Sequence, residues 1–354
     1  MPIPTEPVGS IPRAPRLQQA MQHHASGEID STTLERFYDE AVKDTIERFE
    51  ATGSPMISDG EQTKSSFATY PLDGLTNLAP DGVSIPFADG HSRQLPRISA
   101  APFRYSGFAG SYLQRARKFA TKPLKQAVIS ASAMSLLYPQ DGLPGYSQTQ
   151  FIDDLVGQAV GDIRSCFDNG AAAVQVDFTE GRLAVKLDPG KQLLRQFIDL
   201  NNRVFAEFSP AERQRIGVHT CPGGDHNSTH SADVEYHELI PMLMELNVGA
   251  FYMQMASEKN PDAVLAVVGR HLKPDQRVFV GVIDVIDNTI ESPQTVRDRV
   301  LLAARHIPAE QLGTTDDCGF SPFGDDVATA RDTAFAKIAA RIAGTAMAAE
   351  TLGI

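Results

Sequence analysis

The residues best suited to chemistry are one histidine and two cysteines in the C-terminal half of the chain. His219 and Cys221 are two positions apart, and Cys318 follows a pair of aspartates much later in the sequence. Each motif ends a short apolar run that is typical of a buried strand. One imidazole and two thiolates suit zinc, and three protein ligands with an open position are typical of a catalytic zinc site. The set therefore predicts a zinc centre that activates a thiol substrate.

Other side chains offer alternative interpretations of the same region. A His-x-Cys spacing is weak evidence by itself, and a lone histidine is as easily part of a protein core. His226, His230 and Asp225 could compete as ligands, although we expect them to line a loop and contact the ligands from outside. Cys166 falls on the apolar face of an expected helix, which favours a buried structural thiol.

Eight short apolar runs predict strands that are covered on both faces. The expected strands comprise residues 6–10, 55–60, 126–130, 173–177, 216–220, 250–255, 278–283 and 312–315. Helical patterns follow most of them, at residues 34–51, 152–169, 193–207, 234–246, 261–271, 293–306 and 327–349. Thr32 and Glu35 fit a capping box before the first of these helices.

This alternation predicts the α/β class, as one (β/α)₈ barrel domain over residues 1–354. Residues 62–125 are too many for a simple connection. They predict an elaborated excursion between the second and third strands, with a hairpin near residues 98–108.

Active sites of barrels lie at the carboxyl ends of the strands, and the unusual polar residues of this chain fall there. They are Ser10, Asp59, Glu61, Asp177, Gln254, Asp284, Asp316 and Asp317, together with the zinc candidates. Asp284, Asp287 or Asp317 could transfer a proton during catalysis. Glu61 and Asp177 could also be ordinary capping or salt-bridging carboxylates, and Ser10 could simply belong to a turn.

Composition narrows the partners and the compartment. The net charge of −12 argues against nucleic acid and anionic membrane surfaces as partners. No segment approaches the ~20 apolar residues that span a bilayer, and the N-terminus lacks the pattern of a signal peptide. Three cysteines are no disulfide framework, so we expect a cytoplasmic protein with free thiols and small-molecule substrates.

The motifs resemble the C-terminal catalytic barrel of cobalamin-independent methionine synthase, including its short single-barrel form. Epoxyalkane:coenzyme M transferases belong to the same superfamily. The resemblance covers essentially the whole chain and rests on five strings: VGSIP at 8–12, DGE at 59–61, VQVD at 174–177, HTC at 219–221 and DCG at 317–319. It implies that His219, Cys221 and Cys318 bind Zn²⁺, and that Ser10, Glu61 and Asp177 hold the amino-acid end of homocysteine.

The sequence departs from the family's pattern at three points. Gln254 occupies the position of the family's fourth zinc ligand, a glutamate, and is a poorer ligand in that place. Ile286 stands near the end of the seventh strand, where methionine synthases place a histidine that protonates the folate leaving group. The chain also has no tryptophan to stack on a pterin. The thiol half of the site is kept and the folate half is not.

The expected function is a zinc-dependent thiol S-methyltransferase or alkyltransferase that takes homocysteine or a similar thiol and an alkyl donor. Two alternatives remain open. The electrophile could be different, such as an epoxide whose alkoxide is protonated by Tyr70, Arg104 or Tyr138. The chain could also be a non-catalytic zinc-binding barrel.

Overall fold

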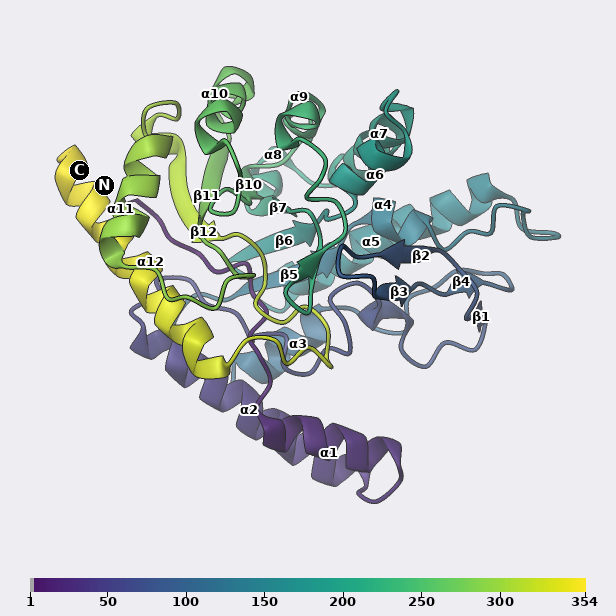
Figure 1. The fold of residues 1–354 in the computed structure, drawn as a ribbon. Coiled ribbons are helices and arrows are strands. Elements are labelled where there is room, and N and C mark those ends of the chain that lie inside the picture. The colour runs from purple at the N-terminus through teal and green to yellow at the C-terminus, as the bar shows by residue number, and fades with distance from the viewer. Residues whose placement is uncertain (1–2) are drawn as a thin grey trace.

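The computed structural model describes residues 3–354, which are arranged around a parallel six-stranded sheet (Figure 1). Its strand order is β12-β11-β10-β7-β6-β5. The strands are β5 (Lys125–Ile129), β6 (Ala173–Asp177), β7 (Ile216–Thr220), β10 (Ala250–Met253), β11 (Arg277–Ile283) and β12 (Leu312–Asp316). These six confirm the corresponding expected strands, because continuous apolar runs in a parallel sheet are buried on both faces.

The two N-terminal barrel positions are occupied by extended segments that make one bridge each. Thr5 pairs with Thr314 of β12, and Ile57 pairs with Leu124 beside β5, both in parallel. The Ile11 amide donates to the Gly60 carbonyl at 3.0 Å and joins the two segments, which completes the (β/α)₈ barrel. The expectation of two regular strands here was wrong. In the first segment the Glu6 amide donates to the Thr314 carbonyl at 3.0 Å, so Pro7, which has no N–H, faces away from β12 and cannot donate to the neighbour on its other side.

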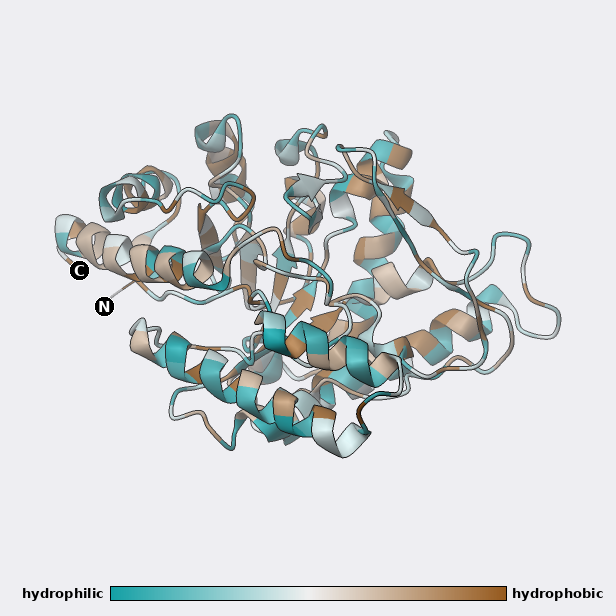
Figure 2. Ribbon diagram, turned by 60° about the horizontal axis from the view of Figure 1, so that its bottom comes forward, coloured by the Kyte–Doolittle hydropathy of each residue, from teal (hydrophilic) through white to brown (hydrophobic). Residues whose placement is uncertain are grey.

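Helices cover the outside of the barrel (Figure 1). The longer ones are α1 (Pro15–Ala25), α2 (Ser31–Ala51), α5 (Gln148–Asp168), α7 (Gln192–Phe205), α10 (Pro261–His271), α11 (Pro293–Ala303) and α12 (Arg331–Leu352). The shorter ones are α3 (Gly110–Ala116), α4 (Ala131–Ser135), α6 (Gly181–Leu187), α8 (Pro210–Arg213) and α9 (Ile240–Leu243). Figure 2 shows the two N-terminal helices with mostly hydrophilic residues in front of the more hydrophobic strands. Within the described residues, no helix combines the length and apolar character needed to cross a membrane.

Two helical expectations need correction. The cap of α2 is Asp30, whose carboxylate accepts from the Thr33 amide at 2.8 Å, so Thr32 and Glu35 form no capping box. The helix expected over 234–246 is reduced to a 3₁₀ turn, Tyr236–Glu238, and to α9. Pro241 explains the break, because a proline inside a helix removes a hydrogen bond and clashes with the preceding turn.

The excursion before β5 contains two small antiparallel pairs. β1 (Leu78–Ala79) pairs with β4 (Arg97–Ile98), and β2 (Ser84–Pro86) pairs with β3 (Ser92–Gln94). The hairpin thus lies at residues 84–94 and not at 98–108, since Asp89-Gly90 provides the turn, with φ of +96° at the glycine. The Ala88 amide donates to the Thr229 carbonyl at 3.0 Å, which anchors the hairpin beside the segment that follows β7.

Candidate active site

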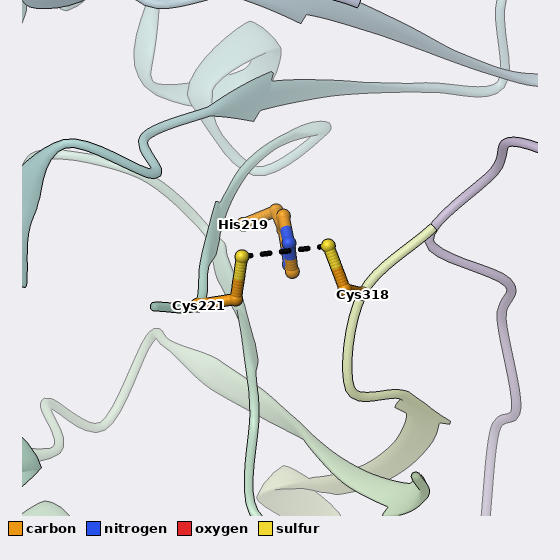
Figure 3. Close-up of side chains that lie close together, drawn as sticks. All are labelled: His219, Cys221 and Cys318. Atoms are coloured by element: carbon orange, nitrogen blue, oxygen red, sulfur yellow. Dashed lines mark hydrogen bonds between the residues drawn. The ribbon is translucent and has the colours of Figure 1, made fainter. Parts of the chain in front are cut away.

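The three predicted zinc ligands converge at the carboxyl ends of β7 and β12 (Figure 3). His219 lies in β7, Cys221 just beyond it, and Cys318 just beyond β12. Their ligand atoms all lie within 4.8 Å of one another, and the two sulfur atoms are 3.4 Å apart. Two sulfurs on one tetrahedral zinc, at bonds of ~2.3 Å, would be ~3.8 Å apart. The side chains therefore already have nearly the spacing that one metal ion requires.

The orientation of His219 also fits a metal. Its Nδ1 lies 3.2 Å from the carbonyl oxygen of Tyr252, its register partner on β10. Its Nε2 is buried and has no hydrogen-bond partner among the described residues. A backbone carbonyl that accepts from one ring nitrogen sets the tautomer and leaves the lone pair of the other nitrogen available to a metal.

The electrostatics of the two cysteines favour one thiolate even before a metal binds. The hydrogen bond from Cys318 lowers the pKa of Cys221 against the opposing effect of burial. The Gly223 amide also donates to the Cys221 sulfur, at 3.3 Å. Cys166 lies elsewhere, on the buried face of α5, where burial raises the pKa of its thiol. The first two sulfurs have the character of ligands, and the third has that of a core residue.

A small pocket beside the ligands contains all three predicted substrate-binding residues. Its lining includes Ser10, Glu61 and Asp177 as well as His219 and Cys318. Strand register accounts for part of this arrangement, because Asp177 of β6 is the neighbour of His219 on β7.

Each of the three has a defined environment. Glu61 has a φ of +55° and forms a buried salt bridge with Lys64, at 2.9 Å. Asp177 accepts from the side-chain amide nitrogen of Gln175 at 2.8 Å, and burial raises the pKa of Asp177 to about 6. Ser10 accepts from the Ser321 amide at 3.2 Å.

Gly319 makes room for Ser10. A Cβ on this glycine would lie 2.0 Å from the Ser10 hydroxyl oxygen, which is far too close for any side chain. The glycine after Cys318 therefore lets the first segment of the barrel approach the last one.

Two of the three aspartates predicted to transfer protons, Asp284 and Asp317, accept from backbone amides, and the third, Asp287, is exposed and accepts from the Thr289 amide at 2.9 Å. Asp317 accepts from the amides of Met255, Ala256 and Ser257 and from the Ser257 hydroxyl, at 2.7–2.9 Å. Asp284 accepts from two amides in the turn after β11. Neither lines the pocket beside the ligands. Both carboxylates accept from backbone amides outside this pocket, so the catalytic role of Asp284 and Asp317 stays a prediction.

Two other strand-end carboxylates are also structural. Asp316 pairs with the buried guanidinium of Arg341 in α12. Asp59 accepts from the Glu61 amide at 2.9 Å and so supports the unusual backbone at that residue.

Gln254 follows β10 and lies beside the ligands through its backbone. Its amide donates to the Thr220 carbonyl at 3.2 Å, and its side-chain nitrogen donates to the Ser257 hydroxyl at 2.6 Å. The side-chain oxygen is buried without a partner among the described residues. A neutral amide oxygen is a weaker ligand than the carboxylate expected from the resemblance.

A larger pocket of about 580 Å³ adjoins the small one, and Phe67, Thr179 and Gly224 line both. Most of its lining side chains are apolar; they include Phe67, Ile85, Phe87, Leu95, Met134, Leu136, Leu183, Phe323 and Val327. Ile286 lies near this junction, because its Cδ1 would be 3.7 Å from a Cβ on Gly224.

His230 and Glu180 are buried ionisable side chains in the wall of this pocket. Neither of them was predicted there from the sequence. Burial lowers the pKa of His230 to about 4 and raises that of Glu180 to about 7. Glu180 had no recognisable motif around it, and its position three residues after Asp177 was the only available signal.

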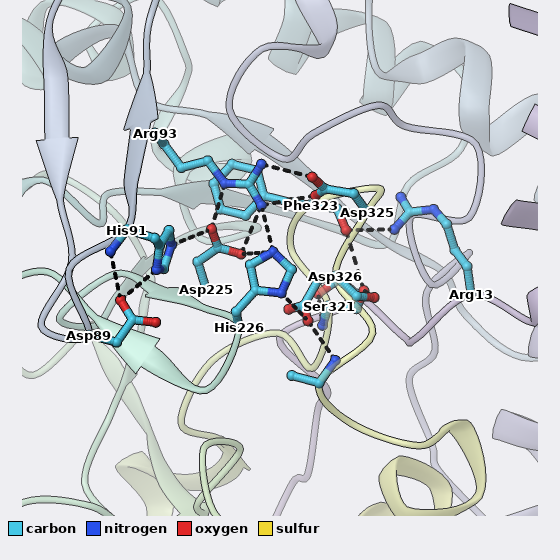
Figure 4. A network of polar contacts seen from close by, with 12 residues as sticks. Arg13, Asp89, His91, Arg93, Asp225, His226, Ser321, Phe323, Asp325 and Asp326 are labelled. Carbon is cyan, nitrogen blue, oxygen red and sulfur yellow. Dashed lines mark hydrogen bonds and ion pairs between the residues drawn. The ribbon is translucent and has the colours of Figure 1, made fainter. Parts of the chain in front are cut away.

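A polar network closes one side of this pocket (Figure 4). Arg93 of β3 pairs with Asp225, at 2.5 Å, and with Asp325, at 2.9 Å. His91 bridges Asp225 and Asp89 of the hairpin turn, while His226 lies 3.6 Å from Asp326. Asp225 and His226 thus join the excursion to the loops after β7 and β12, and they lie outside the group of His219, Cys221 and Cys318 that could share a metal ion. The network keeps the hairpin beside the pocket.

A sequence profile described as "Cobalamin-independent synthase, Catalytic domain" matches residues 148–340, more than half of the chain. The chain belongs to this family. The methionine synthase of Sulfurisphaera tokodaii is 21% identical over 350 residues, covering 99% of this chain and 94% of that protein. A methyltransferase of Lactococcus lactis, named for 5-methyltetrahydropteroyltriglutamate and homocysteine, is 21% identical over 91% of this chain but only 41% of its own length.

Solved structures confirm the family's barrel fold for this chain. A B12-independent methionine synthase from Shewanella sp. has a TM-score of 0.76 at 18% identity, and the match covers 99% of each chain. A putative vitamin-B12-independent methionine synthase from Listeria monocytogenes has a TM-score of 0.73 at 19% identity over 97% of each chain. The predicted resemblance and the predicted barrel are therefore both confirmed.

Proposed function

We propose that the protein is a zinc-dependent thiol S-alkyltransferase of the methionine-synthase type, with methyl as the leading candidate for the transferred group. The observation that carries the proposal is the convergence of His219, Cys221 and Cys318 beside a pocket that contains two carboxylates. The names of the relatives support it, since they are methionine synthases and homocysteine methyltransferases. The Shewanella structure contains selenomethionine, which has the shape of the expected product.

The roles of the protein's own residues follow from their positions. A bound zinc would lower the pKa of a substrate thiol and keep it as a nucleophilic thiolate near neutral pH. Glu61 and Asp177 would bind the ammonium group of homocysteine, and Ser10 would contact the same amino-acid end. Because these carboxylates are buried, their hydrogen bonds to an ammonium group are stronger than in water.

X-ray absorption at the zinc edge tests this function. We expect about one zinc per chain, with two sulfur neighbours at ~2.3 Å and one nitrogen at ~2.0–2.1 Å. Homocysteine should add a third sulfur at the same distance, whereas methionine should not. An unchanged sulfur count with saturating homocysteine would contradict thiol activation and favour the non-catalytic zinc barrel.

A thiol transferase that uses another electrophile, such as an epoxide, is the second candidate. The apolar wall of the larger pocket and Ile286 beside Gly224 favour it. The proton donors first considered for it are unsuitable, because none of them lines either pocket. Tyr70 donates to Asp162, Tyr138 donates to the Tyr146 carbonyl at 2.7 Å, and Arg104 pairs with Asp154.

We also propose that the chain acts as one domain, with residues 62–125 as part of the barrel's active-site wall. The anchoring of the hairpin to the segments after β7 and β12 supports this view. The three free cysteines are consistent with a reducing cytoplasm and with small molecules, a thiol and an alkyl donor, as the partners.

A further inference from the structure

Glu180 is a buried carboxyl group in the wall of the larger pocket. It follows β6, immediately before α6, and only 4% of its surface is exposed. The preceding residue, Thr179, lines both pockets, and Glu180 itself lines the larger one. The carboxyl group of Glu180 thus belongs to the wall of the larger pocket, one residue after a position that both pockets share.

The hydrogen bonds of Glu180 determine which oxygen can carry a proton. Oε1 accepts from the hydroxyls of Ser130, at 2.6 Å, and Ser132. Both serine oxygens in turn accept from nitrogen donors, Ser130 from the Ala133 amide at 3.0 Å and Ser132 from Asn201 at 2.7 Å. Oε1 is therefore fully used as an acceptor, and a proton on this carboxyl must lie on Oε2.

Oε2 is buried and has no hydrogen-bond partner among the described residues. A buried polar atom without a partner costs free energy unless a ligand supplies one. Burial raises the pKa of Glu180 to about 7, against the opposing effect of the two serines, and the charge of Asp177 adds to the rise. The protonated form is thus populated near neutral pH, as a general acid requires.

The other lining residues of the larger pocket indicate which kind of substrate could bind next to Glu180. Its wall is mainly aromatic and aliphatic, and among residues 3–354 Arg93 is the only Lys or Arg side chain that lines it. Arg93 is already paired with Asp225 and Asp325. His230 is uncharged at neutral pH, because burial lowers its pKa to about 4. The wall therefore offers apolar surface and no free cation to an anionic tail.

We propose that Glu180 is the general acid of the alkyl transfer and that the larger pocket binds an electrophile with an apolar body. The proposal rests on the proposed function and deepens it. The thiolate sulfur attacks the carbon of the electrophile, so that the S–C bond forms as the bond to the departing oxygen or nitrogen breaks. That atom keeps the electron pair and takes the proton from Oε2. The proton that the next thiol loses restores Glu180, so the cycle needs no further reactant.

Two electrophiles with similar apolar bodies separate proton donation from binding. Styrene oxide needs a proton on its departing oxygen, whereas benzyl bromide releases bromide without one. With homocysteine and the zinc-loaded protein, Glu180→Gln should lower kcat/KM for styrene oxide by about 10²–10⁴-fold. The rate with benzyl bromide, above the uncatalysed rate, should change less than about twofold. The matched control, exposed Glu235→Gln, should change neither rate.

The pH dependence provides a readout that a merely structural role would not move. The styrene oxide rate should fall as pH rises through about 7, because the proton on Glu180 is lost. Ser132→Ala removes a donor to Oε1, destabilises the carboxylate and should move this limb to higher pH. In difference infrared spectra, the carboxylic acid band that disappears near pH 7 should be missing from Glu180→Gln.

Several outcomes would overturn the proposal. Equal losses with both electrophiles would make Glu180 structural, and an unchanged styrene oxide rate would exclude it as the acid. Turnover of neither electrophile, in protein whose zinc gains a third sulfur from homocysteine, would exclude an apolar electrophile while keeping the proposed function. Failure of homocysteine to bind zinc would instead refute the proposed function itself.

Discussion

His219, Cys221 and Cys318 differ from the other histidines and cysteines of the described chain because their free ligand atoms point toward one another. We predict that Cys318→Ser abolishes zinc retention and activity while the barrel stays folded, since the ligands lie at the catalytic face and not in the core. Metal analysis and circular dichroism measure the two effects. Cys166→Ser is the control and should keep its zinc, with at most a moderate loss of stability from a buried hydroxyl.

Asp177 tests the binding of the thiol substrate's tail. Asp177→Asn should weaken homocysteine binding by roughly 1.5–3 kcal/mol, the contribution of a hydrogen bond to a charged group. A thiol without the amine, such as mercaptopropionate, should bind the variant and the wild type equally. Calorimetry measures both affinities. Equal losses for the two thiols would remove the argument that Asp177 binds an ammonium group.

The same residue predicts a pH dependence. Burial raises the pKa of Asp177 to about 6, so the carboxylate gains a proton as pH falls through that value. Homocysteine affinity should therefore decline below about pH 6 more steeply than the affinity of the amine-free thiol. Identical pH profiles would show that Asp177 does not face the ammonium group. The sequence thus identifies Asp177 as a candidate binding residue, but the burial of its carboxyl group sets the pH at which it gains a proton.

At the scale of elements, Asp317 joins the end of β12 to the segment that follows β10. Gly281 of β11 makes this possible, because a Cβ there would lie 2.1 Å from the Asp317 carboxylate. Asp317→Asn replaces one acceptor oxygen by an NH₂ group that would face N–H donors. We expect this change to lower the free energy of unfolding by about 1–3 kcal/mol. Asp284→Asn, which affects only a local turn, should cost less in the same urea titration. Equal costs would contradict a special role for Asp317.

The β2–β3 hairpin depends on Arg93 for its position. Arg93→Gln would leave Asp225 and Asp325 without their shared cation, so residues 84–94 should separate from the barrel more often. Hydrogen exchange in this hairpin should accelerate, whereas β6 and β7 should be unaffected. Arg97→Gln is the matched control, because its partner Asp81 is exposed and belongs to the same excursion. Faster exchange in both variants would show general instability of the excursion.

At the scale of the whole molecule, the shape and polarity of the larger pocket determine which alkyl donors can bind. Methyl-tetrahydrofolate carries a polar pterin and an anionic tail, and the pocket lining has no free cation for such a tail. Ile286 lies where a histidine is expected, and the chain has no tryptophan. We predict poor or absent methionine formation from this donor and homocysteine. Turnover at ~1 s⁻¹ or above would contradict the prediction.

The convergence of His219, Cys221 and Cys318, the family and six of the barrel strands could be predicted from the sequence alone. Ligand chemistry belongs to the side chain itself, and a buried parallel strand requires an apolar run wherever it lies in the chain. The positions of Asp177 and His219 were also predictable, because both residues lie at the carboxyl ends of predicted strands.

Only the tertiary structure decided how the remaining carboxylates are used. Asp317 and Glu180 have similar chemistry in the sequence, yet Asp317 accepts from four donors while one oxygen of Glu180 has none. The Asp89-Gly90 turn was a local signal for the hairpin, whereas the anchoring of the hairpin beside the pocket depends on distant segments, after β7 and β12. Hydrogen-bond donors and burial come from residues far away in the chain, and they determine whether a carboxyl group holds a turn or carries a proton.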